Sequence, residues 1–234
     1  MPDLDFAQFD ALTFDCYGTL IDWEAGISRG LQAVLGAAGI TVADDVLLER
    51  YARHEAVLET GPYQTYRVIL AEAMRRVCAE YDVEPPDDDV ARFAGGVGEW
   101  PAFSDSAEAL RALAGRFRLG VITNCDDALF AGSQRRLGVT FDWIITAEQA
   151  RSYKPSLANF ELAFERIGLP RDRILHVAQS LFHDHVPAKS LGLTTAWIDR
   201  RRDRPGFGAT PPAKATPDLV APDMATFAEV ALAG

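Results

Sequence analysis

The sequence is poor in cysteine and carries fewer basic than acidic residues. Its 234 residues include three cysteines, Cys16, Cys78 and Cys125, which lie far apart and form no Cys-x-x-Cys pair. A disulfide framework and a structural zinc site are therefore not expected, and a reducing compartment suits the thiols. Lysine and arginine number 23 against 34 aspartate and glutamate residues, which gives a net charge of −11. This balance argues against nucleic acid and anionic membranes as partners.

Long apolar runs are also missing. No run reaches the roughly 20 residues that a membrane-spanning helix needs. The first residues, MPDLDFAQ, lack the basic start and apolar stretch of a signal peptide, so we expect a cytoplasmic protein. There are no internal repeats or low-complexity tracts. Hydrophobic residues make up 48% of the chain, which is enough for a substantial core.

Short apolar runs alternate with helical patterns along most of the chain. A first strand ends at Asp15, and further strands are predicted at 117–123, 143–146, 174–177, 194–198 and, at an edge, 218–220. Strands separated by helices of about ten residues predict an α/β fold with a doubly wound parallel sheet.

Residues 22–98 differ from the rest, because they contain four helical patterns and no convincing strand. The economical arrangement is an α/β core domain of residues 1–21 and 99–234. An α-helical cap domain of residues 22–98 is inserted into it after the first strand.

Polar side chains follow four of the predicted strands: Asp15; Thr123 and Asn124; Lys154; and Ser180, His183 and Asp184. Because the carboxyl ends of parallel strands share one edge of a sheet, these side chains are expected to converge. Each alone has an ordinary explanation, such as a turn former, a helix cap or a solvated lysine. Together they supply a carboxylate nucleophile, hydrogen-bond donors, a cation and a second carboxylate.

The segments FDCYGTL, VITNC, SYKP and AQSLFHD follow one another in this order. With them the chain resembles the haloacid dehalogenase superfamily over essentially its whole length. The resemblance implies a Rossmann-like core with an inserted α-helical cap. Most members are magnesium-dependent phosphatases with Asp-x-Asp in the first segment, where this chain has Tyr17 at the second position. That difference is shared with the L-2-haloacid dehalogenase branch, which the chain resembles most.

Tyr17 supports that branch on chemical grounds as well. A phosphatase must protonate its alkoxide leaving group, and the second aspartate supplies the acid. It must also neutralise a phosphate, usually with a metal ion held by carboxylates. A halide is a very weak base and leaves without a proton. Tyr17 therefore disfavours phosphate-ester chemistry more than carbon–halogen displacement.

The resemblance implies a hydrolase that acts on carbon–halide bonds without a metal or other cofactor. Asp15 would displace the halide of a small 2-haloacid, and water would hydrolyse the resulting aspartyl ester to the 2-hydroxyacid. Lys154 would keep Asp15 ionised, Thr19 would orient it, and Asp184 would hold Lys154 or the water. The substrate would be bound by Tyr17, Thr123, Asn124, Ser180, His183 and, from the cap, Arg50. A homodimer is also implied.

Two residues depart from the pattern of the branch. Leu181 stands where the branch has asparagine, and Phe160 where it has tyrosine, so the hydrogen bonds of both are lost. We interpret His176 and His185 as packed or solvated histidines.

One alternative is a phosphatase that binds magnesium through Asp15, the carbonyl of residue 17 and Asp184. Another is a binding module without activity.

Overall fold

Residues 4–233 are described here from a computed structural model. They form a six-stranded sheet in the order β3-β2-β1-β4-β5-β6, in which every neighbouring pair runs parallel. The strands are β1 (Ala11–Phe14), β2 (Arg118–Thr123), β3 (Trp143–Thr146), β4 (Ile174–Ala178), β5 (Thr194–Ile198) and β6 (Leu219–Ala221). The predicted α/β sheet is confirmed, including its edge strand. Because β1 is central, Asp15 leaves the sheet between the ends of β2 and β4.

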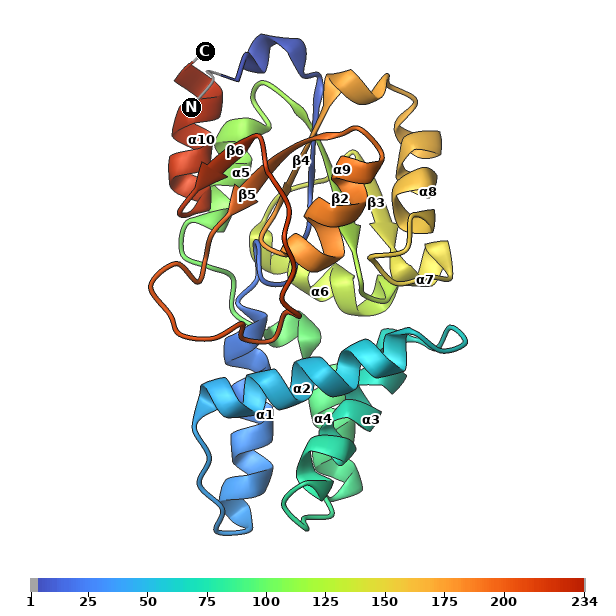
Figure 1. The fold of residues 1–234 in the computed structure, drawn as a ribbon, viewed down its shortest axis with the longest axis vertical. Helices are drawn as coiled ribbons and strands as arrows, with labels where there is room; N and C mark the ends of the chain where they lie inside the picture. The colour runs from blue at the N-terminus through green and yellow to red at the C-terminus, as the bar shows by residue number, and fades with distance from the viewer. Residues whose placement is uncertain (1–3, 234) are drawn as a thin grey trace.

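Helices cover both faces of this sheet (Figure 1). One face carries α8 (Ala158–Ile167) and α9 (Val186–Ser190); the other carries α5 (Ser106–Leu113), α6 (Asp127–Leu137) and α10 (Met224–Ala233). In β1, Leu12 and Phe14 pack toward the second group of helices and Ala11 toward the first. The alternation of side chains along a strand thus produces two apolar cores, one on each face.

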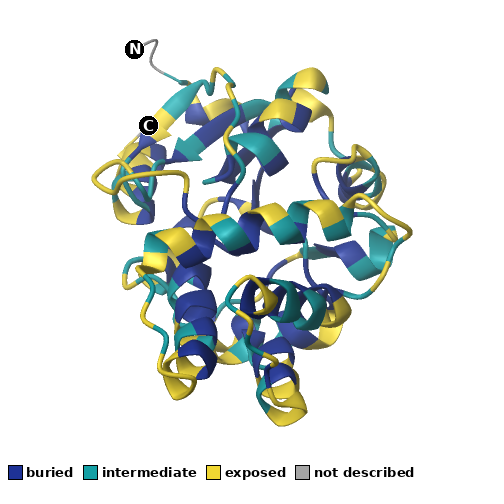
Figure 2. Cartoon of the chain, turned by 60° about the horizontal axis from the view of Figure 1, so that its bottom comes forward, coloured by how far each residue is buried: buried dark blue, intermediate teal, exposed yellow. Residues whose placement is uncertain are grey.

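Four helices lie beyond the carboxyl ends of the strands (Figure 1). They are α1 (Trp23–Ala37), α2 (Asp44–Glu59), α3 (Tyr66–Ala79) and α4 (Asp87–Gly95), close to the four patterns expected in residues 22–98. Buried residues on these helices alternate with exposed ones, as expected for amphipathic helices (Figure 2). We call this group of helices the cap. The domain boundaries drawn from the sequence stay a prediction.

The segment after β4 is not a regular α-helix throughout. It begins with a wide, π-helical turn at Leu181–His185, followed by α9. The amides of Asp184 and His185 both donate to the carbonyl of Ser180, at 3.2 Å each, which widens the turn. Short connecting helices complete the described chain: α7 (Ala147–Ala150) and 3₁₀ turns at Phe6–Gln8, Val97–Glu99 and Arg171–Arg173.

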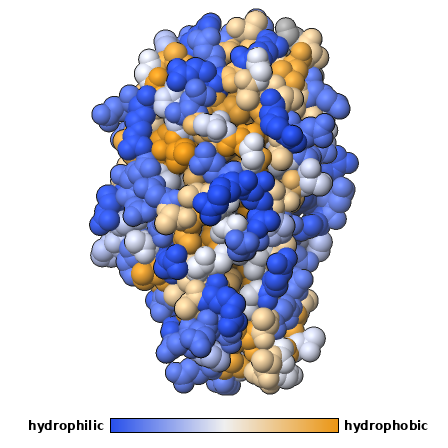
Figure 3. Space-filling view, turned by 180° about the vertical axis from the view of Figure 1, so that it is seen from behind, coloured by the Kyte–Doolittle hydropathy of each residue, from blue (hydrophilic) through white to orange (hydrophobic). Residues whose placement is uncertain are grey.

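The outer surface mixes hydrophilic and hydrophobic residues. On the face opposite to that of Figure 1, hydrophobic areas lie scattered among hydrophilic side chains (Figure 3). Within residues 4–233, each helix is too short or too polar to cross a membrane.

Candidate active site

Asp15 lies directly after β1 at the carboxyl edge of the sheet. Its amide donates to the Val177 carbonyl of β4 at 3.0 Å, which extends the strand pairing by one residue. The residue is 6% exposed and lines a pocket between the sheet edge and the cap. The sequence prediction that Asp15 reaches a crevice at the strand ends agrees with this position.

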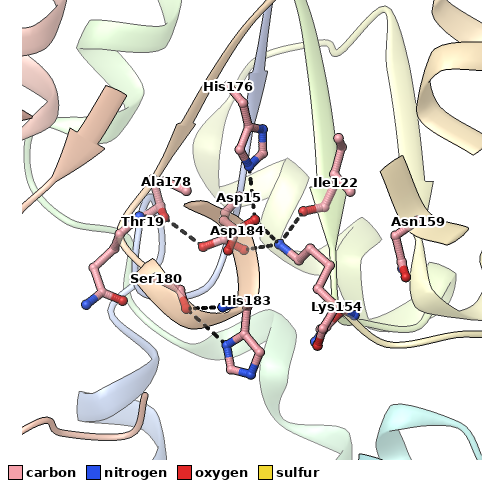
Figure 4. Close-up of polar contacts among 12 residues, drawn as sticks. Asp15, Thr19, Ile122, Lys154, Asn159, His176, Ala178, Ser180, His183 and Asp184 are labelled. Atoms are coloured by element: carbon pink, nitrogen blue, oxygen red, sulfur yellow. Dashed lines mark hydrogen bonds and ion pairs between the residues drawn. The ribbon is translucent and has the colours of Figure 1, made fainter. Parts of the chain in front are cut away.

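Lys154 is buried against Asp15. Its Nζ donates to Asp15 Oδ1 at 2.9 Å, to Asp184 Oδ1 at 2.7 Å and to the Ile122 carbonyl at 2.8 Å (Figure 4). These three acceptors use all three ammonium protons. Burial lowers the pKa of Lys154, but the charges of Asp15 and Asp184 outweigh this effect and raise it above its usual value. Lys154 is therefore a fixed cation shared by two carboxylates.

The ionisation of the two carboxylates depends on that cation. Burial raises the pKa of Asp15, and the charge of Asp184 adds to this effect, while Lys154 and the Thr19 hydroxyl lower it. Burial also opposes ionisation of Asp184, but Lys154 and His176 bring the pKa of Asp184 well below its ordinary value. Removing Lys154 would leave two buried carboxylates side by side.

Thr19 holds the second oxygen of Asp15. Its hydroxyl donates to Asp15 Oδ2 at 2.7 Å and accepts from the amide of Gln179 at 2.9 Å. Both oxygens of the carboxylate are thus oriented, one by Lys154 and the other by Thr19. This contact matches the orienting role expected for Thr19.

Asn124 organises the loop that carries Lys154. Its side-chain amide donates to the Lys154 carbonyl at 3.0 Å, and its Oδ1 accepts from the Lys154 amide at 2.7 Å. Asn124 also lines the pocket. Thr123, expected beside it, is fully buried in β2 and does not line the pocket. A direct contact from Thr123 to substrate is therefore not supported by its position.

His176 is a residue whose place in the site the sequence analysis missed. Its Nε2 lies 3.0 Å from Asp184 Oδ1 (Figure 4). Its Nδ1 lies 2.9 Å from the Thr13 hydroxyl. Thr13 and His176 are direct partners in the β1–β4 pairing, so two polar residues in adjacent buried strands were the available signal. Phe160, where the family branch has tyrosine, packs against the His176 ring, with ring centres 5.2 Å apart.

The turn after β4 brings Ser180 and His183 to the pocket. Ser180 Oγ accepts from the His183 amide at 2.8 Å and lies 3.1 Å from the ring Nδ1. Burial lowers the pKa of His183 to about 4, so the ring is neutral at pH 7. Leu181 lies outside this pocket. His185 is packed below the turn, with Nε2 2.9 Å from the Ala178 carbonyl, as interpreted from the sequence.

Tyr17 is part of the pocket lining, and its hydroxyl is bound by residues outside that lining. The hydroxyl lies 2.9 Å from Ser133 Oγ on α6 and accepts from the thiol of Cys125 at 3.4 Å. Burial raises the pKa of Tyr17 well above its usual value. The position next to the nucleophile therefore offers no acidic proton to a leaving group.

Arg50 does not reach the pocket. Its guanidinium is paired with Glu80 and lies over the ring of Tyr81, 4.9 Å from the centroid, on a part-exposed side of the cap. Arg50 is not among the residues that line the pocket. The sequence prediction of a substrate-binding Arg50 is therefore not supported by its position, and the reason is the rotation of α2 about its axis.

The cap wall instead carries two carboxylates that the sequence analysis did not find, Glu55 and Glu59 of α2. Glu55 Oε1 accepts from the hydroxyls of Tyr51 at 2.7 Å and Tyr66 at 2.9 Å. Tyr51, Glu55 and Glu59 recur every fourth residue, so they share one side of the helix. That spacing was the available signal. Trp23, Tyr66 and Thr210 complete the lining.

Asp15 and Asp184 are the two carboxylates that the magnesium alternative would use. Among the residues described, no group of three histidine, cysteine, aspartate or glutamate side chains is placed to hold a metal ion. The Lys154 ammonium already supplies a positive charge to both carboxylates, through Oδ1 of Asp15 and Oδ1 of Asp184. We therefore derive no step through a metal.

Comparisons with known proteins agree with this arrangement. A family model described as haloacid dehalogenase-like hydrolase matches residues 9–181. An (S)-2-haloacid dehalogenase of Pseudomonas putida is 25% identical, over 83% of this chain and 86% of its own. Haloacetate dehalogenase H-2 of Moraxella sp. (strain B) is 28% identical, over 93% of this chain and 95% of its own. The structure of L-2-haloacid dehalogenase from Xanthobacter autotrophicus covers 95% of this chain and 98% of its own, with a TM-score of 0.79 at 20% identity, and shows a shared fold.

Proposed function

Because this chain belongs to the haloacid dehalogenase-like hydrolases, as its four sequence motifs indicated, we propose that it hydrolyses carbon–halogen bonds through an ester on Asp15. The names of its relatives make small 2-haloacids the first substrates to test. One observation carries the proposal. A buried carboxylate is held by a lysine and a threonine, while the neighbouring position offers a tyrosine in place of an acid.

In the first step, an oxygen of Asp15 attacks the carbon that bears the halogen. A carbon–oxygen bond forms, and the halide leaves with the electron pair of the carbon–halogen bond. Lys154 supports this step by favouring the ionised form of Asp15. The leaving halide needs no proton, so the hydroxyl of Tyr17 can remain against Ser133.

In the second step, water attacks the carbonyl carbon of the Asp15 ester. The single bond between that carbonyl carbon and the oxygen joined to the substrate breaks, and the product leaves as the hydroxy compound with this oxygen and one proton of the water. The other proton is released, and the Asp15 carboxylate is restored. Asp184 is suited to bind and orient the attacking water, because its Oδ2 is buried without a hydrogen-bond partner among residues 4–233. Lys154 and His176 hold its other oxygen.

Single-turnover labelling tests the ester directly. With enzyme in excess over chloroacetate or L-2-chloropropionate in ¹⁸O water, the first turnover should place the label in Asp15 and leave the product unlabelled. Asp15→Asn should lower halide release by at least about 10³-fold. The matched control is Asp10→Asn, because Asp10 pairs with Arg173 on the surface before the same strand and should have little effect.

Two results would contradict the proposal. Label in the product of the first turnover would indicate direct attack by water. Magnesium-dependent hydrolysis of p-nitrophenyl phosphate, lost in Asp15→Asn and without halide release from any 2-halo compound, would support the phosphatase instead.

A further inference from the structure

Carboxylates outnumber cationic side chains in the lining of the pocket. Glu55 and Glu59 line it from the cap, and Asp15 and Asp184 line it from the sheet edge. The single cationic side chain in this lining is Lys154. Its three protons are already donated to Asp15, Asp184 and the Ile122 carbonyl, so none is left for a substrate.

Glu59 is the carboxylate without a partner. Its side chain is 93% buried, with 7% exposed. The nearest ionisable nitrogen is Nε2 of His183 at 4.0 Å, which is beyond hydrogen-bond length. Among the residues that the structure describes, no donor lies within hydrogen-bond distance of the Glu59 carboxylate. Its oxygens are not enclosed by the protein, so they are open to the pocket, where a bound ligand can supply the donor.

Glu55, the second carboxylate of the cap, is fixed in position by hydrogen bonds. The hydroxyls of Tyr51 and Tyr66 both bind its Oε1, which fixes the carboxylate toward the pocket. Burial raises the pKa of Glu55 to about 7. Burial and the charge of Glu55 raise the pKa of Glu59 well above its ordinary value. A cation bound between them would reverse both effects and favour the ionised carboxylates.

The other walls also favour a cation. Three aromatic residues, Tyr17, Trp23 and Tyr66, are also part of the lining. Ammonium and amidinium groups are attracted to the faces of such rings, and the attraction grows when water is excluded. An anionic carboxylate in the same place would face Glu55 and Glu59 with no free donor from Lys154 and no guanidinium from Arg50.

We propose that the substrate of this pocket is a small organic halide with a cationic nitrogen group, an ammonium or amidinium, beside the reacting carbon. This inference rests on the proposed dehalogenation at Asp15 and concerns the group that the cap recognises. Glu59 would bind the cationic nitrogen, and Glu55 would add a second charge contact. The covalent steps at the halogen-bearing carbon are unchanged.

Three compounds of nearly the same shape test the charge preference. All three have the same chlorine-bearing carbon. The group beside it is negatively charged in chloroacetate, neutral in 2-chloroacetamide and positively charged in 2-chloroacetamidine. We expect kcat/KM for halide release to rise in that order. Glu59→Gln should lower kcat/KM for the amidine at least about tenfold and change that for the amide little. The control is Glu72→Gln, which removes an exposed carboxylate of α3 and should alter none of the three.

Binding without chemistry separates this inference from the proposed function. We expect acetamidine to bind more tightly than acetamide or acetate by calorimetry, with the preference lost in Glu59→Gln. Tightest binding of acetate, or a preference that survives Glu59→Gln, would overturn the inference whatever the catalytic result. Release of no halide from the three compounds or from 2-chloropropionate would instead contradict the proposed dehalogenation, while the acetamidine result would still decide the recognition of charge.

Discussion

The two walls of the pocket differ in how their charges are paired. On the sheet-edge wall, Lys154 is within 2.9 Å of both Asp15 and Asp184, and His176 supports the second carboxylate. On the cap wall, Glu55 has two tyrosine hydroxyls as neutral partners, and Glu59 has no hydrogen-bond donor among residues 4–233. On the first wall, each carboxylate is already paired with a cation. The second is suited to bind the variable part of a substrate.

The largest effect should come from removing the buried cation of the sheet-edge wall. Lys154→Met removes the shared cation and leaves Asp15 and Asp184 as adjacent buried carboxylates. We expect the free energy of unfolding at pH 7 to fall by about 3–5 kcal/mol, measured by urea denaturation. Halide release should also be lost, because Asp15 would no longer be held ionised.

Lys189→Met is the matched control for that variant. Lys189 forms a part-exposed pair with Asp218, so its removal should cost no more than about 1 kcal/mol. Equal losses in the two variants would mean that the sheet-edge wall does not depend on its buried cation.

The buried carboxylates of the cap wall should make the free energy of unfolding depend on pH. The folded pKa of Glu55 is about 7, above its ordinary value of 4.5, so the folded state binds more protons between these values. Its contribution is fully present below pH 4.5 and is lost as pH rises toward 7, by about 3 kcal/mol in all. Glu55→Gln keeps an acceptor for Tyr51 and Tyr66 but cannot ionise, so this loss should disappear.

Urea denaturation of both proteins from pH 4.5 to 8 measures that difference. The free energies of unfolding of the wild-type protein and Glu55→Gln should diverge steadily as the pH rises, with the variant becoming relatively more stable. Glu72→Gln should run parallel to the wild-type protein. Parallel curves for Glu55→Gln as well would show that Glu55 ionises normally in the fold.

The two walls are linked through Asp126, and a smaller effect is expected there. Asp126 follows β2, and its carboxylate accepts from the amides of Tyr66 at 2.7 Å and Arg67 at 2.9 Å, in the first turn of α3. Loss of such a helix cap in Asp126→Ala should cost about 1–2 kcal/mol of unfolding free energy. Asp126→Asn keeps one acceptor and should cost less. A larger loss for Asp126→Asn would point to a role of the charge rather than of the cap.

Much of the sheet and of the sheet-edge wall could be predicted from the sequence, for a common reason. Strands of a parallel sheet are short apolar runs, and the residue after each run lies at the same edge. Asp15 and Asn124 directly follow β1 and β2, so this rule places them. Lys154 and Asp184 lie several residues beyond β3 and β4, and the order of the four motifs was needed to single them out. His176 was not found, because a polar residue inside a buried strand shows its partner only when the register with Thr13 is known.

The cap wall could not be predicted in the same way, because it depends on the rotation of one helix. Successive residues of a helix differ by about 100°, so Arg50 and Glu55 lie about 140° apart around α2. Glu55 and Glu59, four residues apart, share one side. The amphipathic pattern of α2 predicts a buried side, but residues on either edge of that side can face the pocket or the solvent. Packing against α3 decides which.

Arg50 gives the smallest expected effect and the sharpest contrast between sequence and structure. Because Arg50 pairs with Glu80 on a part-exposed surface, Arg50→Met should change the free energy of unfolding by no more than about 1 kcal/mol. The kcat/KM for halide release should stay close to that of the wild-type protein, since no pocket contact is removed. A tenfold or greater loss, together with a loss of acetate binding, would mean that α2 turns Arg50 toward the substrate, as the resemblance implied. An unchanged rate in Arg50→Met beside a reduced rate in Glu59→Gln would assign recognition on this helix to its carboxylates.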